Sequence, residues 1–129
     1  MLSPILAVSD IDASVDFYVK ALGFSHGWSM NGDDGRTNFA SIRLGDAEIL
    51  LGVTEGFVPA EDLNKRGIGV QLHVHVPPEM DIDALYASAQ AVGAQIMRTI
   101  ETRDWGERAF NLKDPDGYSL MLAQQVTPP

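Results

Sequence analysis

The sequence repeats the same structural signals at an offset of about seventy residues. Asp10 is suited to cap the start of a helix, and Gly23 is at the position where a glycine commonly ends one. Asp81 and Gly93 hold the same two places later in the chain. Because two independent markers agree on the offset, we expect a duplicated module. This repeat constrains the fold more strongly than any other feature.

The segments between these markers have the apolar periodicity of amphipathic helices. Apolar residues recur at spacings of three and four, which places them on one helical face. The residues predicted for these faces are Ile11, Val15, Tyr18 and Leu22 in the first copy and Ile82, Leu85, Tyr86, Ala89 and Val92 in the second.

Strand-like stretches flank both predicted helices. One precedes each helix, at residues 4–8 and 70–76, and three follow it, at 24–30, 37–44 and 47–53 and at 95–101, 108–112 and 118–123. Residues 54–67 lack a periodic apolar face and are interpreted as a linker. We therefore predict an α+β fold of two tandem βαβββ modules in a single domain, residues 1–129. The boundaries are module one 1–53, linker 54–67 and module two 68–129.

Each module is expected to form a curved mixed sheet with its helix on the outer face. A four-stranded sheet of this size needs a partner for its inner face. Either the two modules of one chain or the modules of two chains can supply it, and both arrangements leave a groove. A ligand site is expected in that groove.

Composition and charge exclude several classes of function. The 129 residues include no cysteine, which rules out disulfides, thiol nucleophiles and cysteine-ligated metals. The formal net charge of −9 argues against nucleic-acid binding. It is consistent with attraction of a cationic ligand, or simply with solubility. No apolar run approaches the length of a membrane span, and a cytoplasmic location is expected.

Three segments carry a resemblance to a known family. The sequences of residues 4–24, 38–51 and 104–117 resemble the vicinal oxygen chelate superfamily. This group includes glyoxalase I, extradiol dioxygenases, fosfomycin-resistance enzymes and bleomycin-binding resistance proteins. The segment Asp104-Trp105-Gly106 and the position of Phe39 are most similar to the bleomycin-resistance branch. The resemblance implies a homodimer with ligand grooves at its interface.

The resemblance also indicates where a metal would bind. The ligand positions of metal-dependent members fall near Ser3, Leu50, Gln71 and Met121 of this chain. Leucine cannot ligate a divalent metal and methionine is a poor ligand for hard ions, so only Gln71 fits. The expectation is therefore a site without metal and a protein without a cofactor.

A rearranged metal site is the open alternative. Gln71, His73 and His75 alternate along one strand and so share a sheet face. Glu48 shares the face of Leu50, and a His/His/Glu set suits zinc, iron or nickel. The other interpretation is that the histidines form hydrogen bonds in a polar cavity or lie near a dimer edge.

Aromatic residues are the strongest candidates for ligand contacts. In the bleomycin-resistance branch, the tryptophan that matches Trp105 stacks on the flat heteroaromatic tail of the drug. Phe39 matches an aromatic residue on the same groove wall, and Trp28 is a further candidate. Glu48 is interpreted either as a negative charge for a cationic ligand or as the partner of an arginine in its own chain. The remaining predicted lining residues are Leu50, Gln71, His73 and Met121.

These observations favour a metal-independent small-molecule binding protein. It would resemble bleomycin-type resistance proteins and sequester an aromatic, in particular a cationic, compound at a homodimer interface. The alternative is a divalent-metal-dependent lyase, isomerase or dioxygenase of the same superfamily. No nucleophile elbow or phosphate-binding glycine loop is present, and no catalytic residue is assigned.

Overall fold

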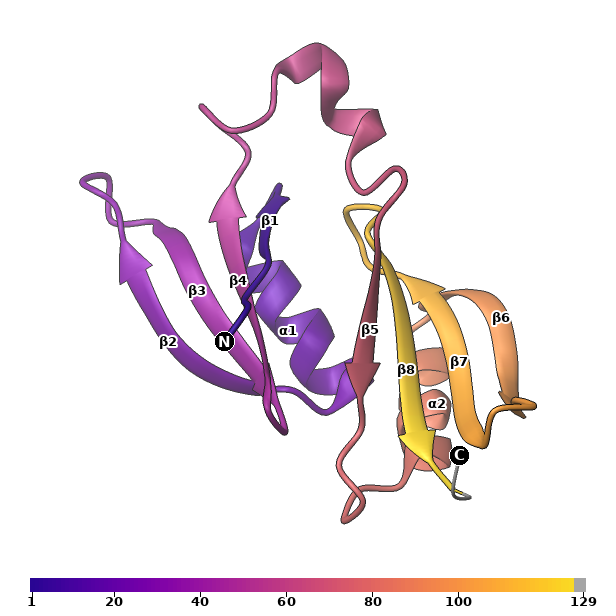
Figure 1. Ribbon diagram of the computed structural model, residues 1–129. Helices are drawn as coiled ribbons and strands as arrows, with labels where there is room; N and C mark the ends of the chain where they lie inside the picture. Colours follow the sequence, from indigo (N-terminus) through magenta and orange to yellow (C-terminus); the bar gives the residue numbers. More distant parts are fainter. Residues whose placement is uncertain (127–129) are drawn as a thin grey trace.

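The computed structural model of the protein describes residues 1–126 and contains two four-stranded sheets (Figure 1). Sheet A has the strand order β1-β4-β3-β2, and sheet B has the order β5-β8-β7-β6. The β1–β4 and β5–β8 pairs are parallel, and the other pairs are antiparallel. The elements are β1 (Ile5–Val8), α1 (Ile11–Leu22), β2 (Ser25–Asn31), β3 (Thr37–Leu44), β4 (Ala47–Val53), the 3-10 helix η1 (Ala60–Lys65), β5 (Gln71–His75), α2 (Ile82–Ala91), β6 (Gln95–Thr102), β7 (Glu107–Lys113) and β8 (Ser119–Gln125). The predicted α+β fold of two βαβββ modules is confirmed.

The markers of the sequence repeat define the helix ends. Asp10 accepts a hydrogen bond from the backbone N–H of Ala13 at 3.0 Å, and Asp81 accepts one from Asp83 at 3.0 Å. Gly23 adopts a left-handed conformation with φ of 71° directly after α1. Helix α2 ends at Ala91, and Gly93 follows two residues later with φ of 77°. Each module therefore begins and ends its helix by a similar local rule.

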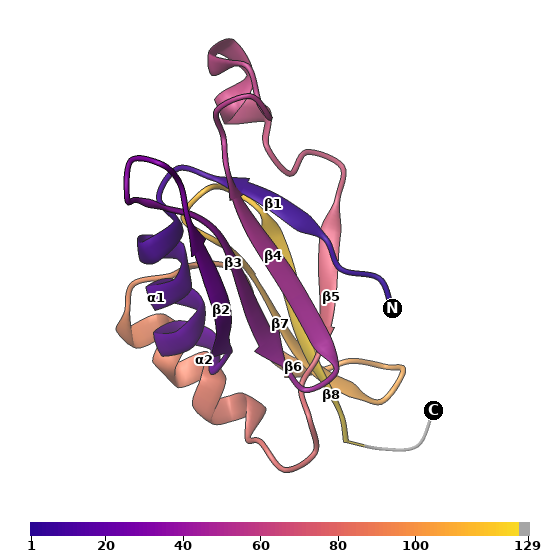
Figure 2. The same cartoon turned by 90° about the vertical axis from the view of Figure 1, so that its left-hand side faces the viewer.

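The two helices lie on the same side of the sheets (Figure 2). One cluster of buried residues joins both modules on the helix-facing side. Its largest fully buried members are Tyr18, Leu22, Ile42, Ile49, Leu51, Ile82, Phe110, Leu112, Leu120 and Leu122. Val92 was expected on the buried face of α2, but it is 48% exposed because the helix has already ended there.

Polar contacts fix one module against the other. Helix α1 packs on α2, and the Ser88 hydroxyl donates to the carbonyl of Ala21 at 2.8 Å. The turn 114–117 of module two also contacts module one, since Asp114 accepts a hydrogen bond from Tyr18. The predicted linker, residues 54–67, contains the 3-10 helix η1 at residues 60–65.

The other face of each sheet points away from the helices. Alternation along the strands turns the residues between core positions to this side, which we call the open face. Within residues 1–126, no helix packs on either open face. None of the described helices is long and apolar enough to cross a membrane. Any ligand groove therefore has to be sought on the open faces or between the modules.

Candidate functional site

Two aromatic rings form a stacked pair on the open face of sheet A. Trp28 and Phe39 have ring centroids 5.7 Å apart and an interplanar angle of 29°. Strand β2 has a register shift between His26 and Trp28, which sets Trp28 opposite Ser41 of β3. A side chain at Gly27 would meet the Ser41 hydroxyl oxygen at 2.9 Å, so the irregular backbone needs glycine at this position. Trp28 remains 43% exposed.

The second ring of this pair lies over Gly52 of β4. A Cβ atom at Gly52 would lie 3.5 Å from the Phe39 ring, so the ring rests on the backbone of β4. Met30 and Ile5, on the same sheet, are 57% and 46% exposed. The open face of sheet A is therefore an apolar surface with an aromatic centre.

Glu48 lies at the polar end of the same face. Its carboxylate accepts hydrogen bonds from the hydroxyls of Ser41 at 2.7 Å and Ser3 at 3.1 Å. Arg43 donates to it at 2.9 Å. These bonds, that of Ser41 foremost, lower the pKa of the Glu48 carboxyl. Of the two interpretations left open by the sequence, the pairing of Glu48 with an arginine of its own chain is the one observed.

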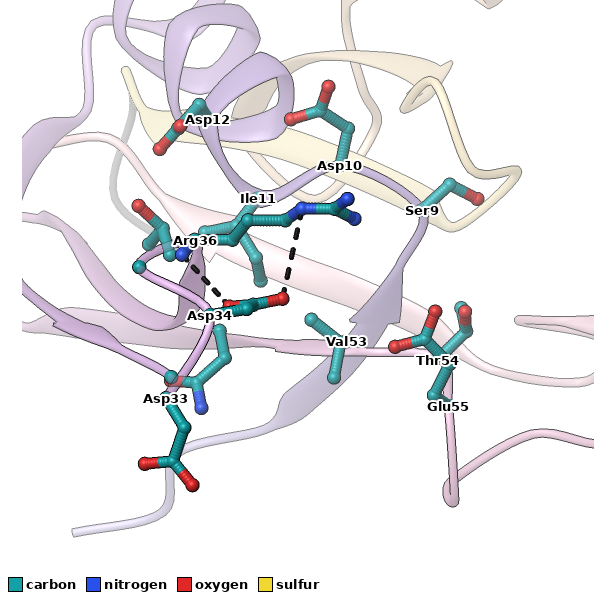
Figure 3. Close-up of a pocket in the computed structure, with 14 residues that line it drawn as sticks. Ser9, Asp10, Ile11, Asp12, Asp33, Asp34, Arg36, Val53, Thr54 and Glu55 are labelled. Atoms are coloured by element: carbon teal, nitrogen blue, oxygen red, sulfur yellow. Dashed lines mark hydrogen bonds and ion pairs between the residues drawn. The ribbon is translucent and has the colours of Figure 1, made fainter.

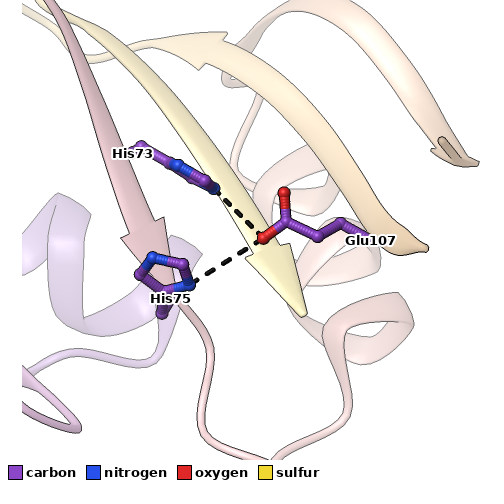
Figure 4. A group of neighbouring side chains, drawn as sticks. All are labelled: His73, His75 and Glu107. Carbon is purple, nitrogen blue, oxygen red and sulfur yellow. Dashed lines mark ion pairs between the residues drawn. The ribbon is translucent and has the colours of Figure 1, made fainter. Parts of the chain in front are cut away.

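Sheet B presents a different set of side chains. His73 and His75 project from the same face of β5, and Glu107 projects toward both from β7 (Figure 4). The Oε2 atom of Glu107 lies 3.3 Å from Nε2 of His73 and 3.8 Å from Nδ1 of His75. One ligand atom from each residue can be chosen so that all lie within 4.8 Å of one another. The Glu107 side chain is buried, whereas both imidazoles are accessible.

Trp105 orients this carboxylate. Its indole Nε1 donates a hydrogen bond to Oε1 of Glu107 at 2.6 Å. The Arg103 guanidinium lies 5.9 Å from the centre of the Trp105 ring and donates to Oδ1 of Asn111 at 2.8 Å. Burial and the neighbouring Arg98 lower the pKa of Arg103, while Glu101 and Glu107 act in the opposite direction. Trp105 keeps 53% of its surface exposed and can still contact a ligand.

A pocket of about 610 Å³ adjoins the two histidines. One of its sides comes from the turn between β3 and β4 and the other from the end of β5 and the segment after it. The lining residues are Gly45, Asp46, Ala47, His73, His75, Val76, Pro77, Pro78 and Glu79. The histidines are thus at a junction between the two modules.

A larger pocket of about 800 Å³ lies at the opposite end of module one (Figure 3). Its lining is rich in carboxylates, but several have structural partners. Asp34 accepts a hydrogen bond from the backbone N–H of Arg36 at 2.9 Å, and Asp10 caps helix α1. None of the site residues predicted from the sequence is among its lining residues. We therefore assign it no ligand.

Comparison with known proteins decides the family. A sequence model of the Glyoxalase/Bleomycin resistance protein/Dioxygenase superfamily matches residues 2–122. The chain belongs to this superfamily. An uncharacterised protein of Mycobacterium bovis is 31% identical over an alignment of 129 positions, which covers 97% of this chain and 83% of that protein.

Solved structures of other proteins have the same fold. TioX from Micromonospora sp. ML1 superposes with a TM-score of 0.74 at 22% identity, covering 100% of this chain and 98% of TioX. TnmS3, an antibiotic binding protein from Streptomyces sp. CB03234, gives a TM-score of 0.68 at 25% identity, covering 95% and 93% of the two chains.

The metal positions of the superfamily do not suit a metal in this chain. Leu50 lies in sheet A, whereas Gln71 and Met121 lie in sheet B. The Ser3 hydroxyl donates to Glu48, and Met121 is buried against Ala109 and Ala123. Of these four positions, only Gln71 has a side chain suited to ligate a metal. The donor chemistry of these four positions therefore does not support the metal chemistry of the superfamily.

The predicted site residues fall into two groups. Trp28, Phe39, Glu48 and Leu50 are in sheet A, and Gln71, His73, Trp105 and Met121 are in sheet B or its β6–β7 turn. The alternative of a rearranged metal site combined Gln71 and the histidines with Glu48, whereas Glu107 is the carboxylate beside the histidines. Sequence reasoning missed Glu107 because it began β7 at residue 108. Its position two residues after Trp105 was the available signal.

Proposed function

We propose that the protein binds a flat aromatic small molecule on the Trp28–Phe39 surface of sheet A. The observation that carries the proposal is the stacked pair itself: Trp28 is 43% exposed, and no helix within residues 1–126 covers this sheet face. A planar ligand can extend this stack. Each aromatic pair contributes about 0.5–1.5 kcal/mol beyond the burial of area. The surrounding Met30 and Ile5 would add apolar contact.

A cationic ligand suits the charge of the molecule. The formal net charge of −9 attracts cations at long range. Glu48 contributes little to this preference on its own, since Arg43 already balances its charge. A cationic aromatic compound, such as a bleomycin-type antibiotic, is therefore the proposed ligand class.

A second copy of the chain would complete the groove. Trp28 lies in sheet A and Trp105 in the β6–β7 turn of sheet B, and both open faces lack a cover within residues 1–126. In a twofold homodimer, sheet B of one copy can cover sheet A of the other and bring the two tryptophans to the same ligand. Light scattering coupled to size exclusion would then give twice the mass of the chain.

Relatives support the binding interpretation. TnmS3, which is described as an antibiotic binding protein, has the same fold over nearly all of this chain. The alternative of a metal-dependent lyase, isomerase or dioxygenase needs ligands that three of the four superfamily positions lack. Stacking on Trp28 and Phe39 requires no metal, so we expect a chelator to leave the affinity unchanged.

Titration with bleomycin and with a neutral flat aromatic compound tests the proposal. Calorimetry should show binding to the wild type, and Trp28→Ala should weaken it at least tenfold, which is about 1.4 kcal/mol. Phe57→Ala is the matched control, because Phe57 is 58% exposed in the linker. Absence of binding by both compounds, or equal losses in the Trp28 and Phe57 variants, would overturn the proposal.

A further inference from the structure

We propose that His73, His75 and Glu107 bind one divalent metal ion such as Zn²⁺. These residues lie outside the ligand positions of the superfamily, apart from sharing strand β5 with Gln71. The inference does not depend on the aromatic ligand proposed above. It depends on the chemistry of two imidazoles and a carboxylate, a ligand set that Zn²⁺ takes in proteins.

The separations of the three side chains fit a metal site. With zinc–ligand bonds of about 2.0–2.2 Å, neighbouring ligand atoms of a tetrahedral site lie roughly 3.3–3.5 Å apart. Oε2 of Glu107 is 3.3 Å from Nε2 of His73 and 3.8 Å from Nδ1 of His75. Both distances exceed the 2.9–3.0 Å of a typical N–H···O hydrogen bond. An ion among these atoms therefore needs only small side-chain adjustments.

Glu107 is held in place before any ion arrives. Its side chain is 8% exposed, and its Oε1 atom accepts a 2.6 Å hydrogen bond from the indole N–H of Trp105. The Oε2 atom is thereby directed toward the histidines (Figure 4). A hydrogen-bonded partner behind a ligating carboxylate commonly contributes 10–100-fold to metal affinity. Trp105 is thus a positioning residue for the proposed metal.

The local charges favour a cation overall. Asp46 and Glu79 line the adjoining pocket and add negative charge close to the histidines. Arg103 is the opposing charge near Glu107, but Nε of Arg103 lies 3.5 Å from a carboxylate oxygen of Glu101. A divalent ion would also balance the buried carboxylate of Glu107, which is costly to leave unpaired.

Three protein ligands leave a coordination position open. Closed structural zinc sites have four protein ligands, whereas sites with three keep a place for water or another ligand. His73 and His75 both line the 610 Å³ pocket, which provides space on that side. The open position would therefore accept water or a small anionic donor such as a carboxylate.

Direct metal titration tests the site without any organic ligand. Untagged protein is freed of metal with a chelator and titrated with Zn²⁺ by calorimetry, then with Co²⁺ by absorption spectroscopy. We expect one ion per chain, a rise in the melting temperature with Zn²⁺, and intense visible Co²⁺ bands typical of a low-coordination site. Binding of less than a tenth of an equivalent would overturn the proposal.

Variants separate this site from adventitious binding. His73→Asn and His75→Asn should each abolish the cobalt bands, and Trp105→Phe should weaken Zn²⁺ binding about 10–100-fold. His26→Asn is the matched control, because His26 is the third histidine of the chain and bonds Ser29 on sheet A. Loss of binding in the His26 variant, or its retention in both β5 variants, contradicts the assignment. Circular dichroism of each variant verifies that it folds.

Discussion

The hydroxyl of Tyr18 donates a 2.7 Å hydrogen bond to the carboxylate of Asp114 and so joins helix α1 to the turn between β7 and β8. Both residues are buried, although they are 96 positions apart in the sequence. The same carboxylate accepts from the backbone N–H groups of Asp116 and Tyr118 at 2.9 Å. One acidic side chain therefore orders its own turn and fastens it to the other module.

Loss of the Tyr18 hydroxyl should loosen the contact between modules. Tyr18→Phe removes one donor to a buried carboxylate, and we expect it to lower the free energy of unfolding by about 1–2 kcal/mol. Urea denaturation measures the change. Tyr86→Phe is the control, since the Tyr86 ring packs edge-on against Phe110 within module two. Equal losses in both variants would show that the Tyr18–Asp114 bond has no particular role.

Asp114 should give stability an unusual dependence on pH. Burial raises the pKa of this carboxyl, and the hydrogen bond from Tyr18 only partly opposes the effect. The folded chain therefore keeps this proton at higher pH than the unfolded chain, in which an aspartate titrates near pH 3.9. The stabilisation from this group is present below that value and is lost as the pH rises through the folded pKa.

Asp114→Asn isolates this contribution because asparagine does not titrate. As the pH increases from about 4 to 7, we expect the wild type to lose stability relative to the variant. Urea denaturation at a series of pH values gives the free energy of unfolding of both proteins as a function of pH. Parallel profiles over the whole range would show that burial does not perturb Asp114 as described.

A largely buried ion pair fastens the linker to the same turn. Arg66 lies 2.9 Å from Asp116, with only 11% and 7% of the two side chains exposed. Removing one member leaves the other charge buried, so Arg66→Met should cost about 3–5 kcal/mol. The double variant with Asp116→Asn should lose less than the sum of the single losses. An additive result in thermal or urea unfolding would contradict direct pairing.

The exposed pair of Lys20 and Asp16 is the matched control for this experiment. Its side chains are 67% and 70% exposed at a separation of 3.3 Å. A pair of this type, four residues apart on a helix, contributes only about 0.3–0.5 kcal/mol. The contrast between the two pairs measures the effect of burial on an ion pair.

Local signals predicted the fold well because they repeat. The capping residues Asp10 and Asp81 and the glycines that follow the helices act over a few positions, so the sequence exposes them directly. The structure of the linker was missed, since η1 has no buried residue and hence no apolar pattern. The end of α2 before Val92 was missed for the opposite reason, because apolar spacing continues beyond the helix.

The candidate sites were predicted only in part. Alternation along β5 placed His73 and His75 together without knowledge of the tertiary structure. Their carboxylate partner depends on how β7 pairs across β8, which is a long-range property, and Glu48 was weighed in place of Glu107. The register shift at Gly27 that turns Trp28 beside Phe39 is likewise a product of strand pairing. The sequence therefore identified candidate site residues more readily than the residues that they contact in the fold.

Gly52 provides a test of the aromatic surface that leaves its rings intact. A Cβ atom at this position would lie 3.5–3.6 Å from the Phe39 ring, which is ordinary van der Waals contact. Gly52→Ala should therefore leave ligand affinity nearly unchanged, whereas the larger side chain of Gly52→Val should displace the ring and weaken binding at least tenfold. Calorimetry with the aromatic probe measures both variants, and near-ultraviolet circular dichroism reports the environment of Trp28. If Gly52→Val binds as the wild type does while the dichroism signal changes, the Trp28–Phe39 surface is not the ligand site.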